Sequence, residues 1–215
     1  MKENTLVEQK ILQAAKTVFI RKGYIAATMQ EIAEEAGTSR PSLHYYFRTK
    51  EKLFEAIFDD ILRFNMPVIA KTLISRKPII EKMQQFVSLY TEALAQNPYM
   101  PTFICMEMLH QHSRLIEKIK SFGFRPDRIL AVLDCQMYKE GIGHIQAIQL
   151  VLNTVSMCVF PIVVEPLLQE ILKDKGKHSA QKVLEEQKHF ISEFISNVLK
   201  HEKEHPHLTT DDRNV

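Results

Sequence analysis

A short stretch of the chain gathers side chains that can exchange hydrogen bonds with another molecule. In the segment RPSLHYYF, residues 40–47, two apolar residues lie four apart, so a helix would turn both to one side. The other side then carries polar groups, from Arg40, Ser42, His44, Tyr45 and Tyr46. A guanidinium, a hydroxyl, an imidazole and two phenols can donate hydrogen bonds, and all but the guanidinium can also accept them. Such a face can meet nucleic acid.

The residues before this face predict a helix that ends in a sharp turn. Thr28 and Glu31 have the T-x-x-E spacing of a capping box, in which the hydroxyl accepts an amide hydrogen bond and the carboxylate reaches back. The helix is therefore expected to begin at about Met29. Ala33 is small enough for a second helix to cross closely over it. Gly37 is expected to end the helix, because glycine takes the left-handed conformation at little cost.

The second helix is expected over about residues 40–47. Thr38 and Ser39 are suitable caps, and Pro41 fits the first turn, where its missing N–H would have had no partner. Inside this helix, Leu43 and Phe47 would pack inward. Two short helices joined by a tight turn form a helix-turn-helix.

Longer helices are expected on both sides of this pair. The first would begin at a capping box that starts with Thr5, run to about Lys22 and stop at Gly23. Thr49 would cap a long helix over about residues 50–71. Apolar residues from these segments would close one core: Tyr24, Ile25, Ile32, Leu43 and Phe47.

The predicted fold class is all-α, because almost every apolar run has a helical period and none alternates long enough for a convincing strand. Further helices are expected over about residues 79–96, 101–112, 113–121, 127–139, 144–160 and 179–201. We divide the chain into an N-terminal three-helix domain (1–48), a long helical domain (49–201) and a polar, frayed tail (202–215).

The composition is that of an ordinary soluble globular protein of 215 residues with a net charge of +2. Residues 1–52 hold nine Lys or Arg against six acids, so a positive excess surrounds the helix-turn-helix. Cys105, Cys135 and Cys158 are an odd number without a signal peptide, which predicts reduced thiols in the cytoplasm. The uncharged stretch 141–164 contains amides and a proline, so we expect a buried interface helix and no membrane span.

Three motifs within residues 8–58 carry a family resemblance: AAKTVFIRKGY, TMQEIAEEAGTS and LHYYFRTKEKLF. With a long connecting helix and a helical body behind them, they resemble the TetR family of transcriptional repressors. The resemblance implies an N-terminal DNA-binding domain and a C-terminal helical domain for ligand binding and dimerisation. Beyond residue 58 the likeness lies only in helix order and length, so it implies architecture and not ligand chemistry.

The resemblance also implies which residues read double-stranded DNA. It places the helix at 40–47 in the major groove, with Arg40, Pro41, Ser42 and His44 at base edges. The Arg40 guanidinium can pair with guanine O6 and N7, whereas Pro41 could touch only a thymine methyl.

Other residues around this helix are expected to hold the DNA backbone. Thr28, Tyr46 and Lys50 would contact phosphates, and Tyr45 could contact a phosphate or pack against the protein. The predicted set outside the base-reading residues is Thr28, Thr38, Ser39, Tyr45, Tyr46 and Lys50.

Useful sequence specificity requires two such DNA-binding domains on a DNA site with two-fold symmetry, so we expect a homodimer on a palindromic operator. The apolar helices at 144–160 and 179–201 resemble the family's last two helices, which pair across the dimer. Intramolecular core is an equally open explanation for both.

The body has enough flexible and aromatic side chains to line a pocket, although such residues are core more often than pocket. The resemblance implies a largely apolar small-molecule effector that releases DNA. The residues expected near it are Phe86, Tyr90, Met100, Phe103, Met106, Leu109, His110, Gln136, Met137, Tyr138, Asn153 and Met157. No cofactor and no metal are expected.

Two other functions stay open at this point. The first is a DNA binder without any ligand, and the second is a metal-dependent helical enzyme. Two E-x-x-H pairs, Glu107 with His110 and Glu186 with His189, have the spacing used by di-iron bundles. The facing helices offer mostly apolar or amide residues, and no catalytic motif is present, so we expect no enzyme.

Overall fold

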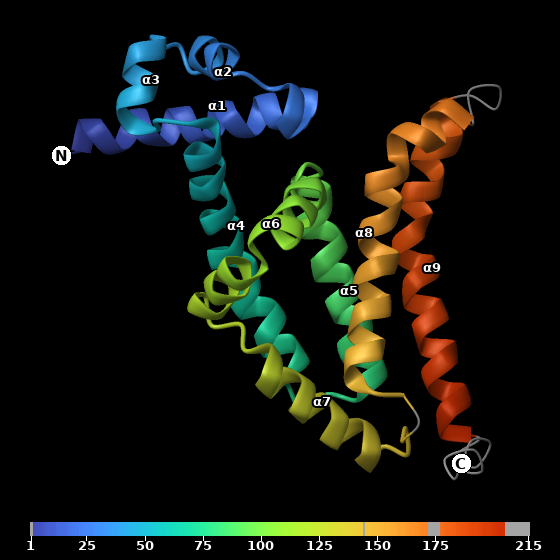
Figure 1. Ribbon diagram of the computed structural model, residues 1–215. Coiled ribbons are helices and arrows are strands. Elements are labelled where there is room, and N and C mark those ends of the chain that lie inside the picture. Colours follow the sequence, from blue (N-terminus) through green and yellow to red (C-terminus); the bar gives the residue numbers. More distant parts are fainter. Residues whose placement is uncertain (1, 144, 172–176, 205–215) are drawn as a thin grey trace. The chain divides into compact units, whose positions relative to one another are not determined.

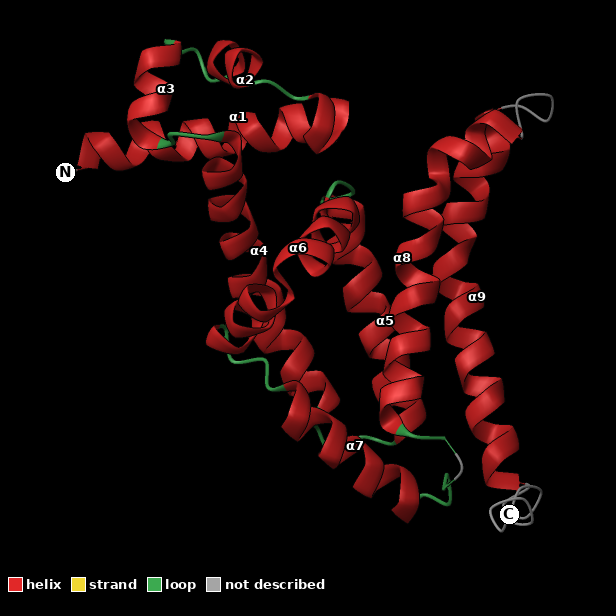
Figure 2. Ribbon diagram, viewed as in Figure 1, coloured by secondary structure: helices red, strands yellow, loops and turns green. Residues whose placement is uncertain are grey.

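The computed structural model describes residues 2–143, 145–171 and 177–204, apart from the side chains of residues 2–5, 103, 106, 107, 110, 111 and 177–185. This described part consists of helices and loops without strands (Figure 2), which confirms the all-α prediction. In chain order the helices are α1 (Lys2–Ala26), α2 (Met29–Glu35), α3 (Arg40–Tyr46), α4 (Lys50–Leu73), α5 (Ile79–Gln96), α6 (Met100–Ser121), α7 (Pro126–Lys139), α8 (Ala147–Ile171) and α9 (Lys177–Glu204).

The chain forms two compact units, and α4 runs through both. The first unit holds residues 1–65 and 96–118, and the second holds 66–95 and 119–215. The units do not divide at residue 48, because rings from α1, the start of α4 and Tyr99 pack together in the first unit. The division of the chain into DNA-binding and regulatory domains therefore stays a prediction about function.

The first unit is built on an apolar stripe of α1. Its fully buried residues include Ile11, Val18 and Phe19, and α2 and α3 each add a buried residue to this core, Ile32 and Leu43. Figure 1 shows α2 and α3 as the short helices beside α1.

Three details of this unit differ from the expectation. Helix α1 begins at Lys2, so Thr5 lies inside it and is not its cap. Lysine and glutamate are good helix formers, which explains the additional turn. Gly23 breaks the helix with φ +75°, as expected, but a short helical piece follows it to Ala26. There Tyr24 turns inward while Ile25 is 73% exposed, so the expected core position of Ile25 is wrong.

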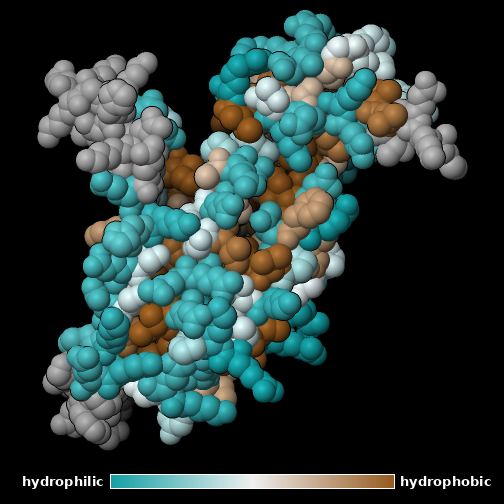
Figure 3. Space-filling view, turned by 180° about the vertical axis from the view of Figure 1, so that it is seen from behind, coloured by the Kyte–Doolittle hydropathy of each residue, from teal (hydrophilic) through white to brown (hydrophobic). Residues whose placement is uncertain are grey.

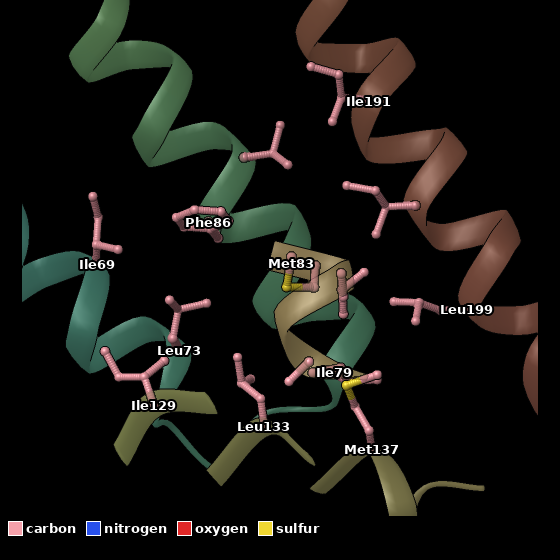
Figure 4. Packing of buried hydrophobic residues seen from close by; sticks show 14 of the residues in the cluster. Ile69, Leu73, Ile79, Met83, Phe86, Ile129, Leu133, Met137, Ile191 and Leu199 are labelled. Atoms are coloured by element: carbon pink, nitrogen blue, oxygen red, sulfur yellow. The ribbon is translucent and has the colours of Figure 1, made fainter. Parts of the chain in front are cut away.

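The second unit has its own core, formed by α4, α5, α7, α8 and α9. In Figure 4 the side chains of Leu73, Met83, Leu133, Ile191 and Leu199 point toward one another from four different helices. Helices α8 and α9 lie side by side along their length (Figure 1).

Helix boundaries beyond residue 96 differ most from the prediction. The expected helices 101–112 and 113–121 form one helix, α6, because a serine lowers helix propensity only slightly. Helix α8 continues past Phe160 through Pro161 and Pro166. The apolar neighbours Cys158 and Ile162 pack in the core, and this packing offsets the hydrogen bond that a proline removes. Helix α9 reaches Glu204, and the remaining predicted tail lies outside the described residues.

Candidate nucleic-acid interface

The predicted capping box forms at the start of α2. The backbone N–H of Glu31 donates to Thr28 Oγ1 at 3.3 Å, and the N–H of Thr28 donates to Glu31 Oε2 at 3.1 Å. The ammonium of Lys22 also donates to Glu31. This bond and those from Thr28 lower the pKa of the Glu31 carboxyl. The start of α2 is therefore held by charge-assisted contacts as well as by its cap.

The turn between the two helices has the backbone pattern that glycine permits. Gly37 has φ +62° and donates its N–H to Glu34 O at 3.0 Å, and the N–H of Thr38 donates to Ala33 O at 3.0 Å. Together these two bonds form a Schellman motif, which satisfies the last carbonyls of a helix. The prediction that Gly37 turns the chain is confirmed.

Helix α3 starts as its sequence predicts. Ser39 is the N-cap, and its hydroxyl accepts the Ser42 N–H at 3.2 Å. Pro41 lies in the first turn. Leu43 is fully buried and Phe47 is 6% exposed, so the inner side of the helix is pinned to the core.

Arg40 and His44 interact on the exposed side of α3. Arg40 Nε donates to His44 Nε2 at 3.4 Å, and His44 Nδ1 lies 3.0 Å from the carbonyl oxygen of Arg48. A carbonyl can only accept, so Nδ1 carries the proton and Nε2 is free to accept from Arg40. The Nη1 and Nη2 groups of Arg40 have no hydrogen-bond partner in the part of the chain that the structure describes. The Nη1 and Nη2 groups of Arg40, which can pair with guanine, are therefore available to a partner, while the Nε of the same guanidinium is held by His44.

Two aromatic rings extend this surface. Tyr45 is 77% exposed, and its ring meets that of Tyr46 edge-on at 5.3 Å. Tyr46 is half-buried. Tyr45 therefore packs against a neighbouring ring and is also open to a partner.

Lys50 has contacts that the sequence did not predict. Its Nζ donates to the carbonyl oxygens of Tyr24, Ile25 and Ala27 at 2.9, 3.1 and 2.9 Å. It also lies 4.7 Å from the centroid of the Tyr24 ring. An ammonium has three protons, so all of them are used within the protein. A phosphate contact by Lys50 would have to replace one of these bonds.

The carbonyls that Lys50 binds lie at the end of α1, where a helix has no donors left of its own. The lysine therefore ties the start of α4 to the end of α1. Lysine side chains are known to satisfy helix C-termini, but the partners here lie more than 20 residues apart. No local pattern in the sequence points to that contact.

Four aromatic rings support the same junction. The ring of Phe19 lies 5.4 Å from that of Phe54, and the rings of Tyr24 and Tyr99 complete the group at 4.9 to 5.8 Å. Tyr99 is 5% exposed, and burial raises the pKa of its hydroxyl far above the usual range. No pattern in the sequence predicted that Tyr99 joins this core.

Comparison with known families bears on this segment. Residues 11–57 match the family described as "Bacterial regulatory proteins, tetR family". They contain α2, the Gly37 turn, α3 and the start of α4. Residues 11–57 therefore match the DNA-binding segment of TetR-family regulators.

Individual relatives agree with this assignment. YfiR of Bacillus subtilis, an uncharacterized HTH-type transcriptional regulator, is 44% identical over 52 residues, which are 24% of this chain and 25% of YfiR. The transcriptional repressor NicS of Pseudomonas putida is 26% identical over 115 residues, which are 53% of this chain and 54% of NicS. The chain thus spans from a quarter to about half of the length of these relatives.

Solved structures share the fold over most of the chain. HlyIIR, a hemolysin II transcriptional regulator, has a TM-score of 0.54 at 23% identity and covers 80% of this chain and 95% of its own. FadR from Bacillus subtilis, solved in complex with stearoyl-CoA, has a TM-score of 0.57 at 16% identity and covers 89% and 96%. At these identities the likeness concerns the all-α fold alone.

The residues expected around an effector are distributed over both units of this protein. Phe86, Tyr90, Met137 and Met157 lie in or against the core of the second unit. Met100 and Leu109 belong to the first unit, where Leu109 is 80% exposed. Of this group, Tyr138 and Asn153 are exposed. The side chains of Phe103, Met106 and His110 lie outside the described residues.

These observations favour the core explanation for several of the proposed pocket residues. Phe86 and Met137 are nearly fully buried because the helical period that gathers methionines and rings also builds a core. Gln136 does line a cavity, but the other residues of that cavity are not from the predicted set.

The two helices expected at a dimer interface have two apolar sides. Ile191, Ile195 and Leu199 of α9 face the core, whereas Phe190 and Phe194 are 57% and 48% exposed with stacked rings. On α8, Ile145 before the helix and Val155 and Val159 within it pack against the core. The exposed apolar residues of α8 include Ile148, Leu152, Phe160, Val163, Leu167 and Ile171.

Figure 3 shows apolar patches among hydrophilic residues on one face of the molecule. Within the described residues, α8 is long and apolar enough to cross a membrane by length and composition. One such helix is weak evidence for a membrane protein, because interface helices share these properties.

The described residues contain no group of three side chains that could hold a metal ion. Of the second E-x-x-H pair, His189 lies 3.8 Å from Glu193 and both are exposed. The side chains of Glu107 and His110 lie outside the described residues. The metal-enzyme alternative gains no support from this arrangement.

Proposed function

We propose that this protein is a transcriptional regulator that binds double-stranded DNA with α3. The exposed Arg40 fork, held by His44 on a helix whose inner side is buried, supports this most directly. Because the helix is held in place before DNA arrives, less conformational freedom is lost on binding. The base-reading residues are then Arg40, Pro41, Ser42 and His44, and the fork pairs with a guanine.

The surrounding residues would position the DNA backbone. We assign phosphate contacts to Thr28 and Tyr46 and to Tyr45 on the exposed edge, with Thr38 and Ser39 holding the helix as caps. Lys50 could reach a phosphate only by giving up a carbonyl, so its main proposed role is to position α4 against α1.

Replacement of Arg40 tests the DNA assignment. A preferred duplex would be selected from a random pool with the parent protein, and its affinity compared with that of duplexes changed at one base pair. Arg40→Ala should reduce the discrimination at one position by about 1 to 3 kcal/mol. Arg128→Ala removes an exposed arginine from α7 and should bind as the parent does. Full discrimination by Arg40→Ala would contradict the proposal.

We further propose that the regulator is a homodimeric repressor on a palindromic operator. The exposed rings of α9 and the exposed aliphatic residues of α8 would form the interface. One α3 makes few contacts, so two copies are needed for affinity at physiological salt. The proposed location is the cytoplasm, which suits a DNA-binding regulator.

The proposed effector is a largely apolar small molecule that releases DNA. FadR, which shares the fold, was solved with stearoyl-CoA, and the apolar acyl chain of that ligand supports, by analogy, an apolar body in the ligand of the present chain. Helix α4 carries residues of both units, so a ligand-favoured conformation of the body could change the separation of two α3 helices.

Native mass spectrometry of the freshly purified protein tests the effector. A retained small molecule, extracted and added back, should weaken binding to the selected duplex. A protein that carries no ligand and whose DNA affinity no extract changes would be a ligand-independent DNA binder.

A further inference from the structure

A solvent-open cavity of about 550 Å³ lies within the second unit. It is lined by the loop that follows α4 and by one side of α7. Ile74, Ala131 and Val132 give it an apolar wall, and Arg76 and Lys139 line it as well. A volume of this size suits a small organic molecule.

The two cations of this cavity have no partner in the described part of the chain. Arg76 and Lys139 are exposed, and neither forms a hydrogen bond or an ion pair there. A guanidinium and an ammonium beside an apolar wall create a site that favours an anion with an apolar body.

Acidic side chains on the neighbouring elements are already engaged. Glu81 at the start of α5 pairs with Lys77 at 2.6 Å. Asp134 on α7 accepts the N–H of Ala147 at 2.7 Å. Each carboxylate thus has a hydrogen-bond partner of its own, and neither forms an ion pair with Arg76 or Lys139.

The third neighbouring carboxylate, Glu140, is engaged more fully. It accepts from Gln136 at 2.6 Å, from the Ile79 N–H at 3.0 Å and from Lys203 at 2.8 Å. These partners lower the pKa of the Glu140 carboxyl, in opposition to its partial burial. The carboxylate is thus held in a network of its own.

The same network makes one wall of the cavity rigid. Gln136 lines the cavity, donates to Lys77 O at 2.6 Å and accepts from the buried ammonium of Lys82. Lys82 is fully buried and also donates to Leu73 O, the last residue of α4, at 3.0 Å. Lys82 and the Glu140 carboxylate both bond to Gln136, so this polar wall is held in place from behind by two charged side chains of opposite sign.

We propose that this cavity binds a small amphipathic anion, a carboxylate or a phosphate monoester on an apolar body. Its head lies with Arg76 and Lys139, and its body lies on Ile74, Ala131 and Val132. The inference does not depend on DNA binding, and its test contains no DNA, so either proposal can fail alone.

Three cysteines make the test direct. Cys135 lines the cavity and is exposed, Cys105 is exposed in the other unit, and Cys158 is buried. Alkylation by iodoacetamide, followed by peptide mass spectrometry, reports all three rates in one sample. The alkylation rate of Cys105 is the internal reference. Rapid alkylation of the buried Cys158 would show that an amphiphile has unfolded the protein, and measurements at such amphiphile concentrations are excluded.

The probes share one chain length and differ in the head group. Dodecanoate and dodecyl phosphate should slow the alkylation of Cys135 relative to Cys105. Dodecanol and dodecyltrimethylammonium should do so at least tenfold less effectively, because a charge-assisted bond is worth about tenfold or more in affinity. Protection by either anion supports the site and identifies the preferred head.

A double variant separates the site from general surfactant binding. R76Q/K139Q should lose the protection by both anions, and R128Q/K120Q, which removes the same charges from exposed positions outside the cavity, should keep it. Equal protection by all four probes, no protection by either anion, or full protection in R76Q/K139Q would each overturn the proposal.

Discussion

The outer face of α3 and the outer face of the α8–α9 pair are both exposed, but they expose opposite chemistry. On α3, polar groups such as the Arg40 fork face outward over a fully buried Leu43. On α8 and α9, large apolar residues such as Phe160 and Phe190 remain 66% and 57% exposed. The first face suits a hydrated, charged partner, and the second suits another apolar surface.

The two faces also differ in what holds them. The starts of α2 and α3 are set by bonds between residues close in sequence, Thr28 with Glu31 and Ser39 with Ser42, and Leu43 anchors α3 to the core. The position of α9 depends on distant partners, for example the bond from Gln84 to Ser196 Oγ at 2.9 Å. Local caps together with one buried anchor therefore specify the polar face, and long-range packing specifies the apolar one. Four variants test this difference.

Loss of the buried anchor of α3 should have the largest effect. Leu43→Ala leaves a cavity beneath the helix and should lower the free energy of unfolding of the first unit by about 2 to 5 kcal/mol. Tyr45→Ala, on the exposed side of the same helix, is the control and should cost far less. Urea unfolding followed by circular dichroism measures both. A small loss for Leu43→Ala would mean that the caps alone hold α3.

Charges placed on the apolar face should separate the proposed dimer. The double variant Phe190→Glu with Phe194→Glu should weaken self-association by about 2 kcal/mol or more per ring, because buried aromatic anchors carry much of the binding energy of an interface. Analytical ultracentrifugation measures the association, and Lys188→Glu, which changes the net charge equally on another side of α9, is the control. An unchanged dimer would show that this face serves another partner.

Removal of the Lys50 ammonium should have an intermediate effect. Lys50→Met leaves three carbonyls without their donor and should cost about 1 to 3 kcal/mol of stability. Lys52→Met, which breaks only an exposed pair with Glu55, should cost less than about 1 kcal/mol. Thermal melts of the two variants compare their losses of stability. An unchanged melting temperature for Lys50→Met would contradict a stabilising role of the Lys50 ammonium.

The salt dependence of DNA binding by Lys50→Met distinguishes its two possible roles. A slope of log affinity against log salt that falls by about one would mean that Lys50 also neutralises a phosphate. An unchanged slope would mean that it only positions α4.

Protonation of the capping box should have the smallest effect. The pKa of Glu31 in the folded protein is lowered below its ordinary value of 4.5 by bonds from Lys22 and Thr28. The carboxylate therefore adds stability at pH values above 4.5, and this contribution is lost as the pH falls through the lowered pKa. The difference in melting temperature between the parent and Glu31→Gln should shrink from pH 7 to pH 3. Glu34→Gln is the matched control on the same helix. A melting-temperature difference for Glu31→Gln that stays constant from pH 7 to pH 3 would refute the link between the Glu31 carboxylate and stability.

The helix-turn-helix could be predicted nearly residue by residue, because its signals are local. A capping pair three residues apart and a glycine with positive φ act within one turn of the chain. The position of Ile25 could not be predicted in this way, because the Gly23 kink decides which side faces the core. The continuous α6 and the extension of α8 through two prolines were missed for the same reason, since packing outweighs a weak local break.

The sequence by itself determined the all-α class, the boundaries of α2 and α3 and the polar character of the outer face of α3, since these follow from helical period and capping. Only the tertiary structure decided that Lys50 binds the end of α1, that Lys82 is buried behind Gln136, and that Arg76 and Lys139 line one cavity. Each of those contacts joins residues far apart in the chain. Side-chain patterns indicate which residues face inward, but the folded chain decides which of them meet.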